Sequence, residues 1–263
     1  MRALSIAATG MMAQQTNVEV IANNIANMNT TGFKAQRAAF ADLLYQTVSQ
    51  PGAQSSDSGT IVPNGIQLGA GVRTQAVYRV TNQGDLSKTS NTYDLAINGK
   101  GYFRIQMPDG TDTYTRAGNF SLSPEGQLVT QDGYTVEPGV TIPATATDVS
   151  VSTTGLVQVT LPGQTGQQTV GQLELTRFPN DAGLKALGDN LFSETDASGS
   201  PQAGTPGSTG YGKIQQKYLE SSNVDVVGEM TDMITAQRAY EMNSKVISAA
   251  DQMMQETANL GNS

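Results

Sequence analysis

The last forty residues of the chain carry an apolar side chain at every seventh position, and this row constrains the fold more than any other feature. A spacing of seven keeps one stripe of a long α-helix facing another helix. The row therefore predicts a C-terminal helix over residues 221–260 that needs a helical partner, in this chain or in another copy. Its members, with one residue that widens the stripe, are Val226, Met230, Met233, Tyr240, Ile247 and Met254.

A second row with the same spacing lies at the other end of the chain, and it predicts a helix over residues 3–28. Gly32 is well placed as the left-handed cap after this helix. We expect the two helices to pack as a coiled-coil-like pair, within one chain and between copies, and the two rows together form a predicted polymerisation seam. The alternative is a hairpin of helices that only supports the middle of the chain. The N-terminal members of the seam are Leu4, Met11, Val18, Ile21 and Ile25.

The middle of the chain alternates apolar and polar residues in short runs that are separated by turns. Pairs such as Asn98-Gly99, Asp109-Gly110 and Asp132-Gly133 are strong hairpin signals. They predict an antiparallel β domain over residues 89–204, either a sandwich or a partly closed barrel. The fold class is therefore α+β, with this domain inserted between terminal helical segments at residues 1–45 and 221–263.

The segments between the helical ends and the β domain, residues 46–88 and 205–220, are predicted to be extended connectors. The part at residues 46–63 is rich in Pro, Gly, Ser and Gln, and a long connection without structure of its own is uncommon in a compact domain. Such a segment is usually functional or disordered. Its candidate functional residues are Gln46, Pro51, Gly52, Gln54, Ser55 and Pro63.

The chain has no cysteine and no histidine, which excludes thiolate and imidazole chemistry. Two glycine-rich fragments, Gly69-Ala70-Gly71 and Gly99-Lys100-Gly101, resemble parts of a phosphate loop, but neither completes a nucleotide-binding pattern. Asp109 and Asp112 hint at a calcium loop, but a β-turn is the stronger interpretation. We therefore expect no enzymatic activity, no cofactor and no metal site.

The formal net charge of −8 argues against nucleic acid and anionic lipid as partners. The sequence has no apolar run close to the ~18 residues that a membrane-spanning helix requires. Thr9 and Gly10 interrupt the apolar N-terminal stretch, and the helical pattern continues past them. We therefore expect neither membrane insertion nor a cleaved signal peptide.

Three stretches resemble signatures of one bacterial family. Residues 22–40 read ANNIANMNTTGFKAQRAAF, residues 94–134 read DLAINGKGYFRIQMPDGTDTYTRAGNFSLSPEGQLVTQDGY, and residues 220–254 begin ESSNVDVVGEMTDMITAQRAYEMNSK. In this order they resemble the N-terminal signature, the β segment and the C-terminal signature of the rod and hook family of flagellar axial proteins. Residues 42–74 are similar to a segment that marks the distal rod members of that family and is missing from typical hook proteins.

The resemblance implies a structural subunit in the flagellar basal body, between the periplasm and the outer membrane. Copies would be exported through the flagellar type III apparatus and would polymerise between the proximal rod proteins and the hook protein. The resulting stiff hollow tube would lie inside the P and L rings, transmit torque and conduct later subunits. Residues 46–63 would lie against neighbouring subunits and stiffen the rod. The alternative is a surface adhesin with a glycan-binding β domain and oligomerising helical ends.

Overall fold

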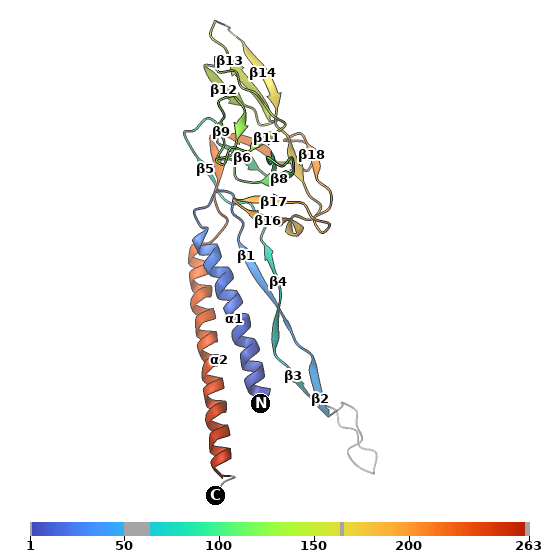
Figure 1. Ribbon diagram of the computed structural model, residues 1–263, viewed down its shortest axis with the longest axis vertical. Helices are drawn as coiled ribbons and strands as arrows, with labels where there is room; N and C mark the ends of the chain where they lie inside the picture. Colours follow the sequence, from blue (N-terminus) through green and yellow to red (C-terminus); the bar gives the residue numbers. More distant parts are fainter. Residues whose placement is uncertain (1, 50–63, 164–165, 261–263) are drawn as a thin grey trace. The chain divides into compact units, whose positions relative to one another are not determined.

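The computed structural model describes residues 2–49, 64–163 and 166–260, and these form two compact units (Figure 1). The helical unit contains the described residues up to 25, from 36 to 78 and from 226 onward. The β-rich unit contains residues 26–35 and 79–225, apart from the gap at 164–165. An N-terminal helix, a β-rich middle and a C-terminal helix confirm the α+β class.

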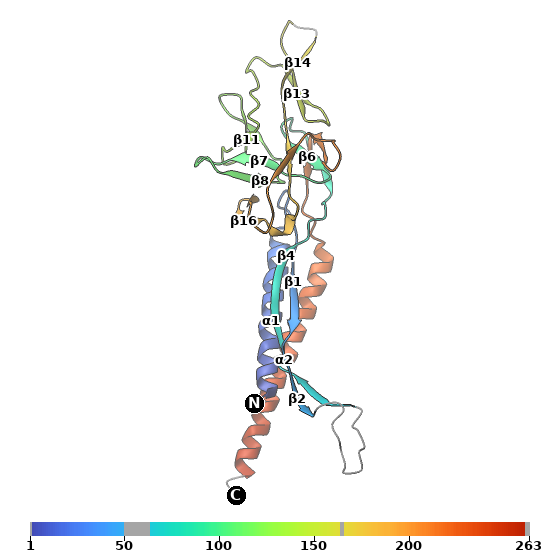
Figure 2. The ribbon, with the colours of Figure 1, turned by 90° about the vertical axis from the view of Figure 1, so that its right-hand side faces the viewer.

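The helical unit contains α1 (Arg2–Ala26) and α2 (Val226–Leu260), which run antiparallel and side by side in Figures 1 and 2. The Asn24 side chain donates to Glu229 at 3.0 Å, and a Cβ added to Gly10 would lie 2.9 Å from the Asn243 amide nitrogen. In this register Arg2 falls near Asp251, so residues 252–260 extend past the start of α1. Both predicted helices are confirmed, although α1 ends two residues earlier than expected and α2 begins five residues later.

The other part of the helical unit is a pair of two-stranded ribbons. β1 (Gln36–Asp42) pairs with β4 (Val72–Arg79), and β2 (Tyr45–Ser49) pairs with β3 (Ile66–Gly69). The assignment of residues 1–45 to a helical segment is therefore too broad, since residues 36–42 form a strand. The segment at residues 46–88, predicted to be an extended connector, contains β3 and β4 and most of β2.

Seven of the described strands in the β-rich unit form one antiparallel sheet in the order β16-β17-β8-β7-β11-β10-β9. Leu191 is paired with Thr115, Phe103 with Thr115, and Val136 with Ile105, so β8 and β7 lie near the middle of the sheet. The strand bounds are β7 (Phe103–Gln106), β8 (Asp112–Thr115), β9 (Ser121–Leu122), β10 (Leu128–Val129), β11 (Thr135–Glu137), β16 (Lys185–Gly188) and β17 (Leu191–Ser193).

The remaining described strands of this unit form a three-stranded sheet, β12-β13-β14, and three two-stranded pairs, β15-β18, β19-β6 and β20-β5. A short 3-10 helix, η1, follows β15. A sandwich or partly closed barrel stays a prediction. The bounds are β5 (Leu86–Lys88), β6 (Leu95–Asn98), β12 (Asp148–Val151), β13 (Leu156–Thr160), β14 (Gln167–Gln172), β15 (Leu175–Arg177), η1 (Asp181–Gly183), β18 (Gln202–Gly204), β19 (Lys213–Gln216) and β20 (Tyr218–Glu220).

The described residues of the β-rich unit form two apolar clusters, and the larger one lies where the inward faces of the strands meet. Phe103 and Phe120 pack edge to face with ring centroids 5.1 Å apart. Burial of such rings and of aliphatic side chains supplies most of the stability of a domain of this kind. The core includes Leu95, Ile97, Phe103, Ile105, Phe120, Val136, Val157, Leu173, Leu175 and Ile214.

One sequence prediction for this unit is wrong, and it concerns pairing between distant segments. Asn98-Gly99 was predicted to close a hairpin, but β6 pairs with β19 and β7 pairs with β8 and β11. Gly99 and Gly101 adopt φ values of 116° and 138°, which turn the chain out of one sheet and into another. The predicted connector at residues 205–220 contains β19 and β20, and Ile214 of β19 belongs to the core.

Candidate functional site

The contact between α1 and α2 is made largely of small and polar side chains. Gly10 approaches Asn243 so closely that a side chain at residue 10 would displace the amide. Small side chains let two helices approach each other, but they bury little apolar area. The buried residues of the two helices are Ala7, Ala13, Val20, Ile21, Asn24, Ala236 and Ala250.

Asn24 joins three elements of the helical unit, although the sequence analysis did not single it out. Its amide nitrogen donates to the backbone carbonyl of Gln36 at 2.8 Å and to Glu229 at 3.0 Å, and its oxygen accepts from the Gln36 amide at 2.8 Å. Asn24 is buried, so these bonds stabilise α1, β1 and α2 against one another. A buried polar residue among apolar positions of a helix stripe was the available signal.

The structure does not gather the predicted seam residues into one buried core. Ile21 is buried, whereas Met230, Tyr240 and Met254 expose 55%, 45% and 41% of their surface. The remaining seam residues are half-buried. They are Leu4, Met11, Val18, Ile25, Val226, Met233 and Ile247. Three of the eleven predicted seam residues are therefore exposed, and most of the others are partly covered within the chain.

Large apolar side chains, among them Met230 of the predicted seam, lie exposed on α2 in two rows. The first row is Val227, Met230 and Ile234, and the second is Met242, Val246 and Met253. Spacings of three, four and seven place the members of each row on one face of the helix. At 3.6 residues per turn, Ile234 and Met242 differ by about 80° around the axis, so the two rows face different directions.

The first row has the spacing of a heptad stripe and was therefore recognisable in the sequence. The sequence analysis followed the parallel row through Val226 and Met233, which the structure places partly against α1. On α1, Ile6 and Met12 are exposed as well, and Met12 exposes 67% of its surface. The helices thus carry more apolar side chains than one pair of helices can cover.

The β2-β3 ribbon adds further exposed apolar side chains. Leu68 lies opposite Gln46 in the pairing, and Leu44, Val48 and Ile66 lie on or next to the same two strands. All four apolar residues are exposed, with Leu44 at 88%. An isolated two-stranded ribbon is marginally stable in water, so its apolar side chains favour contact with another surface.

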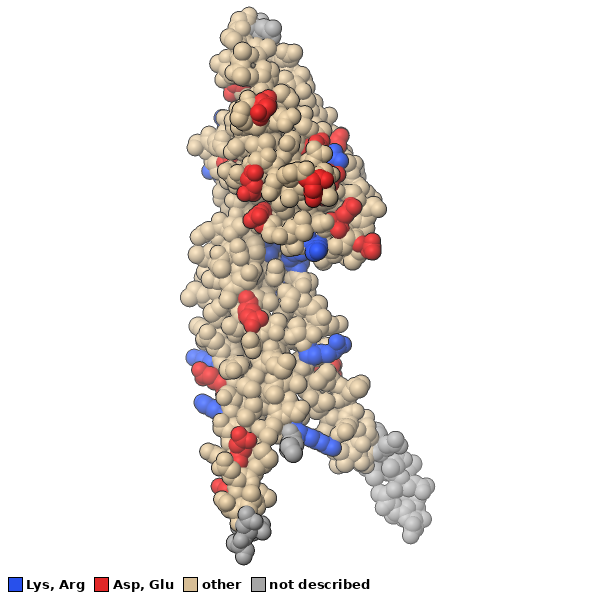
Figure 3. All heavy atoms as spheres, in the orientation of Figure 1, with Lys and Arg blue, Asp and Glu red and all other residues tan. Residues whose placement is uncertain are grey.

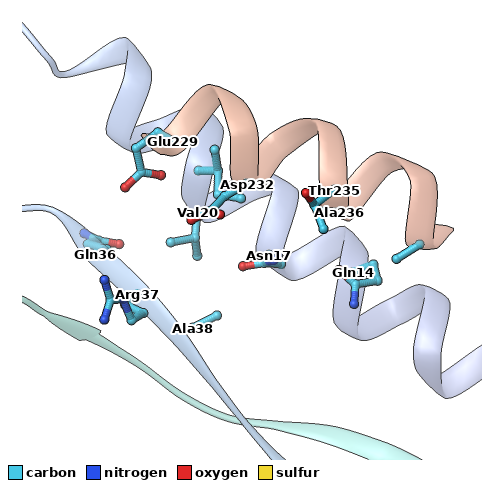
Figure 4. A pocket seen from close by; sticks show the side chains of 12 residues that line it. Gln14, Asn17, Val20, Gln36, Arg37, Ala38, Glu229, Asp232, Thr235 and Ala236 are labelled. Atoms are coloured by element: carbon cyan, nitrogen blue, oxygen red, sulfur yellow. The ribbon is translucent and has the colours of Figure 1, made fainter. Parts of the chain in front are cut away.

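A groove of about 340 Å³ lies between α1, α2 and β1 (Figure 4). Glu229 and Asp232 on α2 line one side, Arg37 on β1 lies across from them, and Asn17 on α1 closes the floor. Amides, carboxylates and one guanidinium make this lining suitable for a polar peptide surface. The described residues contain no group of three or more carboxylates placed to hold a metal ion.

Charged side chains are sparse on the face that Figure 3 shows, where most of the surface is uncharged. This agrees with a charged fraction of 14% for the whole sequence. A surface with few charges is inexpensive to desolvate when another protein covers it. Within the part of the chain that the structure describes, no helix is both long and apolar enough to cross a membrane.

Of the candidate stiffening residues, Gln46 lies in β2 with an exposed side chain. Pro51, Gly52, Gln54, Ser55 and Pro63 lie outside the described residues.

Comparison with known proteins explains the helices and the β-rich unit together. Residues 4–34 match a model described as flagella basal body rod protein, and residues 215–260 match the flagellar basal body rod FlgEFG protein C-terminal model. Residues 96–159 match the flagellar hook protein FlgE/F/G D1 domain. The flagellar basal-body rod protein FlgG of Caulobacter vibrioides is 60% identical over 260 residues, which cover 99% of both chains. The chain belongs to the FlgG family of flagellar basal-body rod proteins.

Two further FlgG proteins are similar over nearly their whole length. The protein of Agrobacterium fabrum is 54% identical and covers 96% of this chain and 97% of its own. That of Buchnera aphidicola subsp. Baizongia pistaciae is 52% identical, with 97% of each chain covered. The resemblance to the rod and hook family is confirmed, and this is a family of structural, non-enzymatic proteins of the flagellar basal body. The adhesin alternative has no support among these relatives.

Proposed function

We propose that this chain is the subunit of the distal rod, where copies polymerise helically into a stiff hollow tube. The tube transmits torque through the cell envelope to the hook and conducts exported subunits. The observation that carries the proposal is the helical unit, in which most buried residues of the two helices are alanines and large Met, Ile and Val side chains of α2 are exposed. Such a unit has its apolar surface arranged for contacts with other copies.

The two rows on α2 favour an open array of subunits. A helical polymer needs two different surfaces that recognise each other, because contact between identical patches closes into a dimer. The rows face different directions, and the β2-β3 ribbon offers a third surface. We propose that the seam residues and these rows pack between subunits as coiled-coil-like contacts, with residues 252–260 reaching a neighbour beyond α1.

The free energy gained by burying the exposed apolar side chains is compatible with assembly that depends on protein concentration. Complete burial of one large apolar side chain contributes about 1.5–3 kcal/mol, and half-exposed side chains contribute roughly half of that. About ten such side chains therefore contribute on the order of 10 kcal/mol, which is comparable with the cost of association. We expect the helices of the free subunit to be partly frayed and to become ordered on assembly. Fully formed helices in the circular dichroism spectrum of dilute protein would contradict this expectation.

Residues 46–63 are proposed to lie against neighbouring subunits and to stiffen the rod. The exposed apolar side chains of the ribbon that flanks them support this role. Pro51 and Pro63 restrict the backbone, and Gln and Ser side chains can bond across subunits. Deletion of residues 50–63 should leave polymerisation possible but should give curved or flexible filaments. Straight and rigid filaments from the deletion variant would rule out the stiffening role.

The proposed partners follow from the place in the rod. They are other copies of the chain, the proximal rod proteins below, the hook protein above, the P- and L-ring proteins around it, and the type III export apparatus that delivers it without a cleaved signal peptide. The location would extend from the periplasm to the outer membrane.

Electron microscopy of the purified protein tests the polymer directly. Tubes or short helical protofilaments are expected as the concentration rises. Compact trimers, or a protein that stays monomeric under all conditions that allow its β-rich unit to fold, would contradict the proposal. A variant with Met242→Ser and Val246→Ser should need a more than tenfold higher concentration to assemble, and Gln237→Ser at an exposed polar position of the same helix should assemble normally.

A further inference from the structure

The chain enters or leaves the β-rich unit at four places, which are near residues 26, 35, 79 and 225. Three short segments next to these places are called root segments here. They are residues 32–35 after α1, residues 79–84 after β4 and residues 220–225 before α2. All three belong to the β-rich unit, and they are held together by side-chain bonds that the proposed polymer contacts do not require.

Glu220 lies at the centre of this network, and its side chain is completely buried. One carboxylate oxygen accepts from Lys34 of the first root segment and from the Gly84 amide of the second, the latter at 3.0 Å. The other oxygen accepts from Arg116 at 2.9 Å. Lys34 also donates to the Asn82 carbonyl at 2.8 Å. One carboxylate therefore connects all three root segments to Arg116.

Arg116 extends the network into the core of the unit. Its remaining guanidinium nitrogen donates to the backbone carbonyls of Gly99 and Gly101, each at 2.8 Å. These residues lie between β6 and β7, where the chain passes from one sheet to another. The charges of Lys34, Arg116 and Glu220 are all buried, so their bonds form in a medium where a charge without its partner is very costly.

Asn223 makes a second set of connections among the same segments. Its side-chain oxygen accepts from the Ala35 amide at 2.7 Å, and its nitrogen donates to the carbonyls of Val80 and Asn82, each at 2.9 Å. The Val80 amide donates in turn to the Ala35 carbonyl at 2.8 Å. This use of Asn223 also explains why α2 begins only at Val226, since residue 223 is held in the β-rich unit.

A buried ion network adds little net stability compared with apolar packing, but it permits one arrangement of its members. We infer that Glu220 and Asn223 form a joint that holds the three root segments and the β6–β7 connection as one rigid body. A mechanical force that acts on the root segments is then transmitted to the sheet through side-chain bonds as well as through the backbone. The joint is a property of the single chain, and its use in carrying torque rests on the proposed function.

Hydrogen exchange on the full-length protein tests the joint. Asn223→Ala should accelerate exchange of the Ala35 and Val80 amides at least tenfold and leave the amides of β7 and β8 unchanged. Asn180→Ala is the matched control, because Asn180 donates to one carbonyl, that of Ala197, elsewhere in the same unit. Unchanged protection of Ala35 and Val80 in Asn223→Ala, or equal acceleration throughout the unit, would overturn the joint.

Two more variants separate the parts of the network. Asn223→Asp keeps the acceptor for Ala35 but places a carboxylate against two carbonyls, so the Val80 amide should lose protection from exchange while the Ala35 amide keeps it.

Glu220→Gln leaves two buried cations without an anion and should lower the melting temperature by about 10 °C. Glu174→Gln, at an exposed position of the same unit, should change it by less than about 2 °C. Equal melting of the two glutamine variants would count against the joint.

The exchange measurement uses unassembled protein, so its outcome does not depend on polymerisation. If the root segments of Asn223→Ala exchange faster but wild-type protein forms no tubes, the joint is supported and the proposed function is contradicted. If tubes form, filaments of Asn223→Ala should bend more than wild-type filaments in electron micrographs. An unchanged persistence length together with released roots would overturn the role of the joint in carrying load.

Discussion

The β-rich unit and the helical unit distribute their apolar residues in opposite ways. In the β-rich unit, Phe103 and Phe120 are each 1% exposed, and the largest side chains lie inside the sheet. In the helical unit, Met242 and Met253 are 68% and 62% exposed, while Ala236 is 2% exposed. The first unit completes its core within one chain. The second buries mostly alanines and leaves several large apolar side chains of α2 exposed.

The largest difference between the two units is expected when one large apolar side chain is removed from each. Phe103→Ala should cost about 3–5 kcal/mol in the free energy of unfolding, because it leaves a cavity beside Phe120. Val227→Ala on α2 should change it by less than about 0.5 kcal/mol. Urea unfolding of the unassembled protein gives both values. Similar costs for the two variants would show that the units do not differ as described.

The second test exchanges exposed apolar side chains for polar ones and follows assembly. Met242→Ser with Val246→Ser should leave the unfolding free energy of the monomer almost unchanged and should raise the critical concentration for polymerisation more than tenfold. Tenfold corresponds to about 1.4 kcal/mol, less than the burial lost from two side chains. Sedimentation gives the critical concentration, with Gln237→Ser as the control. If the variant polymerises like wild type, this row does not belong to the interface between subunits.

A smaller effect is expected from the close contact of α1 and α2. Gly10→Leu should destabilise the helix pair by about 1–3 kcal/mol, because even a Cβ at this position would meet the Asn243 amide. Gly10→Ala should be nearly neutral, since the Asn243 side chain can rotate and alanine favours the helix by about 1 kcal/mol. Thermal melting followed by helical circular dichroism compares the two. Equal effects would mean that the helices do not touch here in solution.

The smallest effect concerns pH and the β-rich unit. Burial raises the pKa of Asp181, although the nearby Lys100, Arg116 and Arg177 oppose the shift. The folded state therefore binds the proton more tightly than the unfolded state, and the ionised carboxylate costs stability above its folded pKa. This cost is relieved as the pH falls through that pKa. At neutral pH, Asp181→Asn should increase stability by less than about 1 kcal/mol and flatten the pH dependence of unfolding. Asp148→Asn, at an exposed residue of β12, is the control.

Local patterns in the sequence predicted local structure well. Asp109-Gly110 and Asp132-Gly133 lie in the turns between β7 and β8 and between β10 and β11, where each glycine has a positive φ. These turns are decided by residues that are neighbours in the chain. Asn98-Gly99 is a turn pair of the same kind, but the partner of β6 is β19, more than a hundred residues later. A pairing of that kind depends on which distant strand fills the core, and Ile214 does so.

The rows of seven determined by themselves that the chain has two long terminal helices with apolar stripes, because helix periodicity is a property of adjacent turns. The sequence also excluded histidine and cysteine chemistry, and its three signatures indicated the family. Only the tertiary structure decided which side of each stripe faces the other helix. Close approach at Gly10 requires small neighbours, so alanines are buried in the pair, and Met230, Met242, Met253 and Met254 of α2 are exposed. Only the fold brings Lys34, Arg116 and Glu220 together, because a buried charge is stable only where distant segments bring its partners to it.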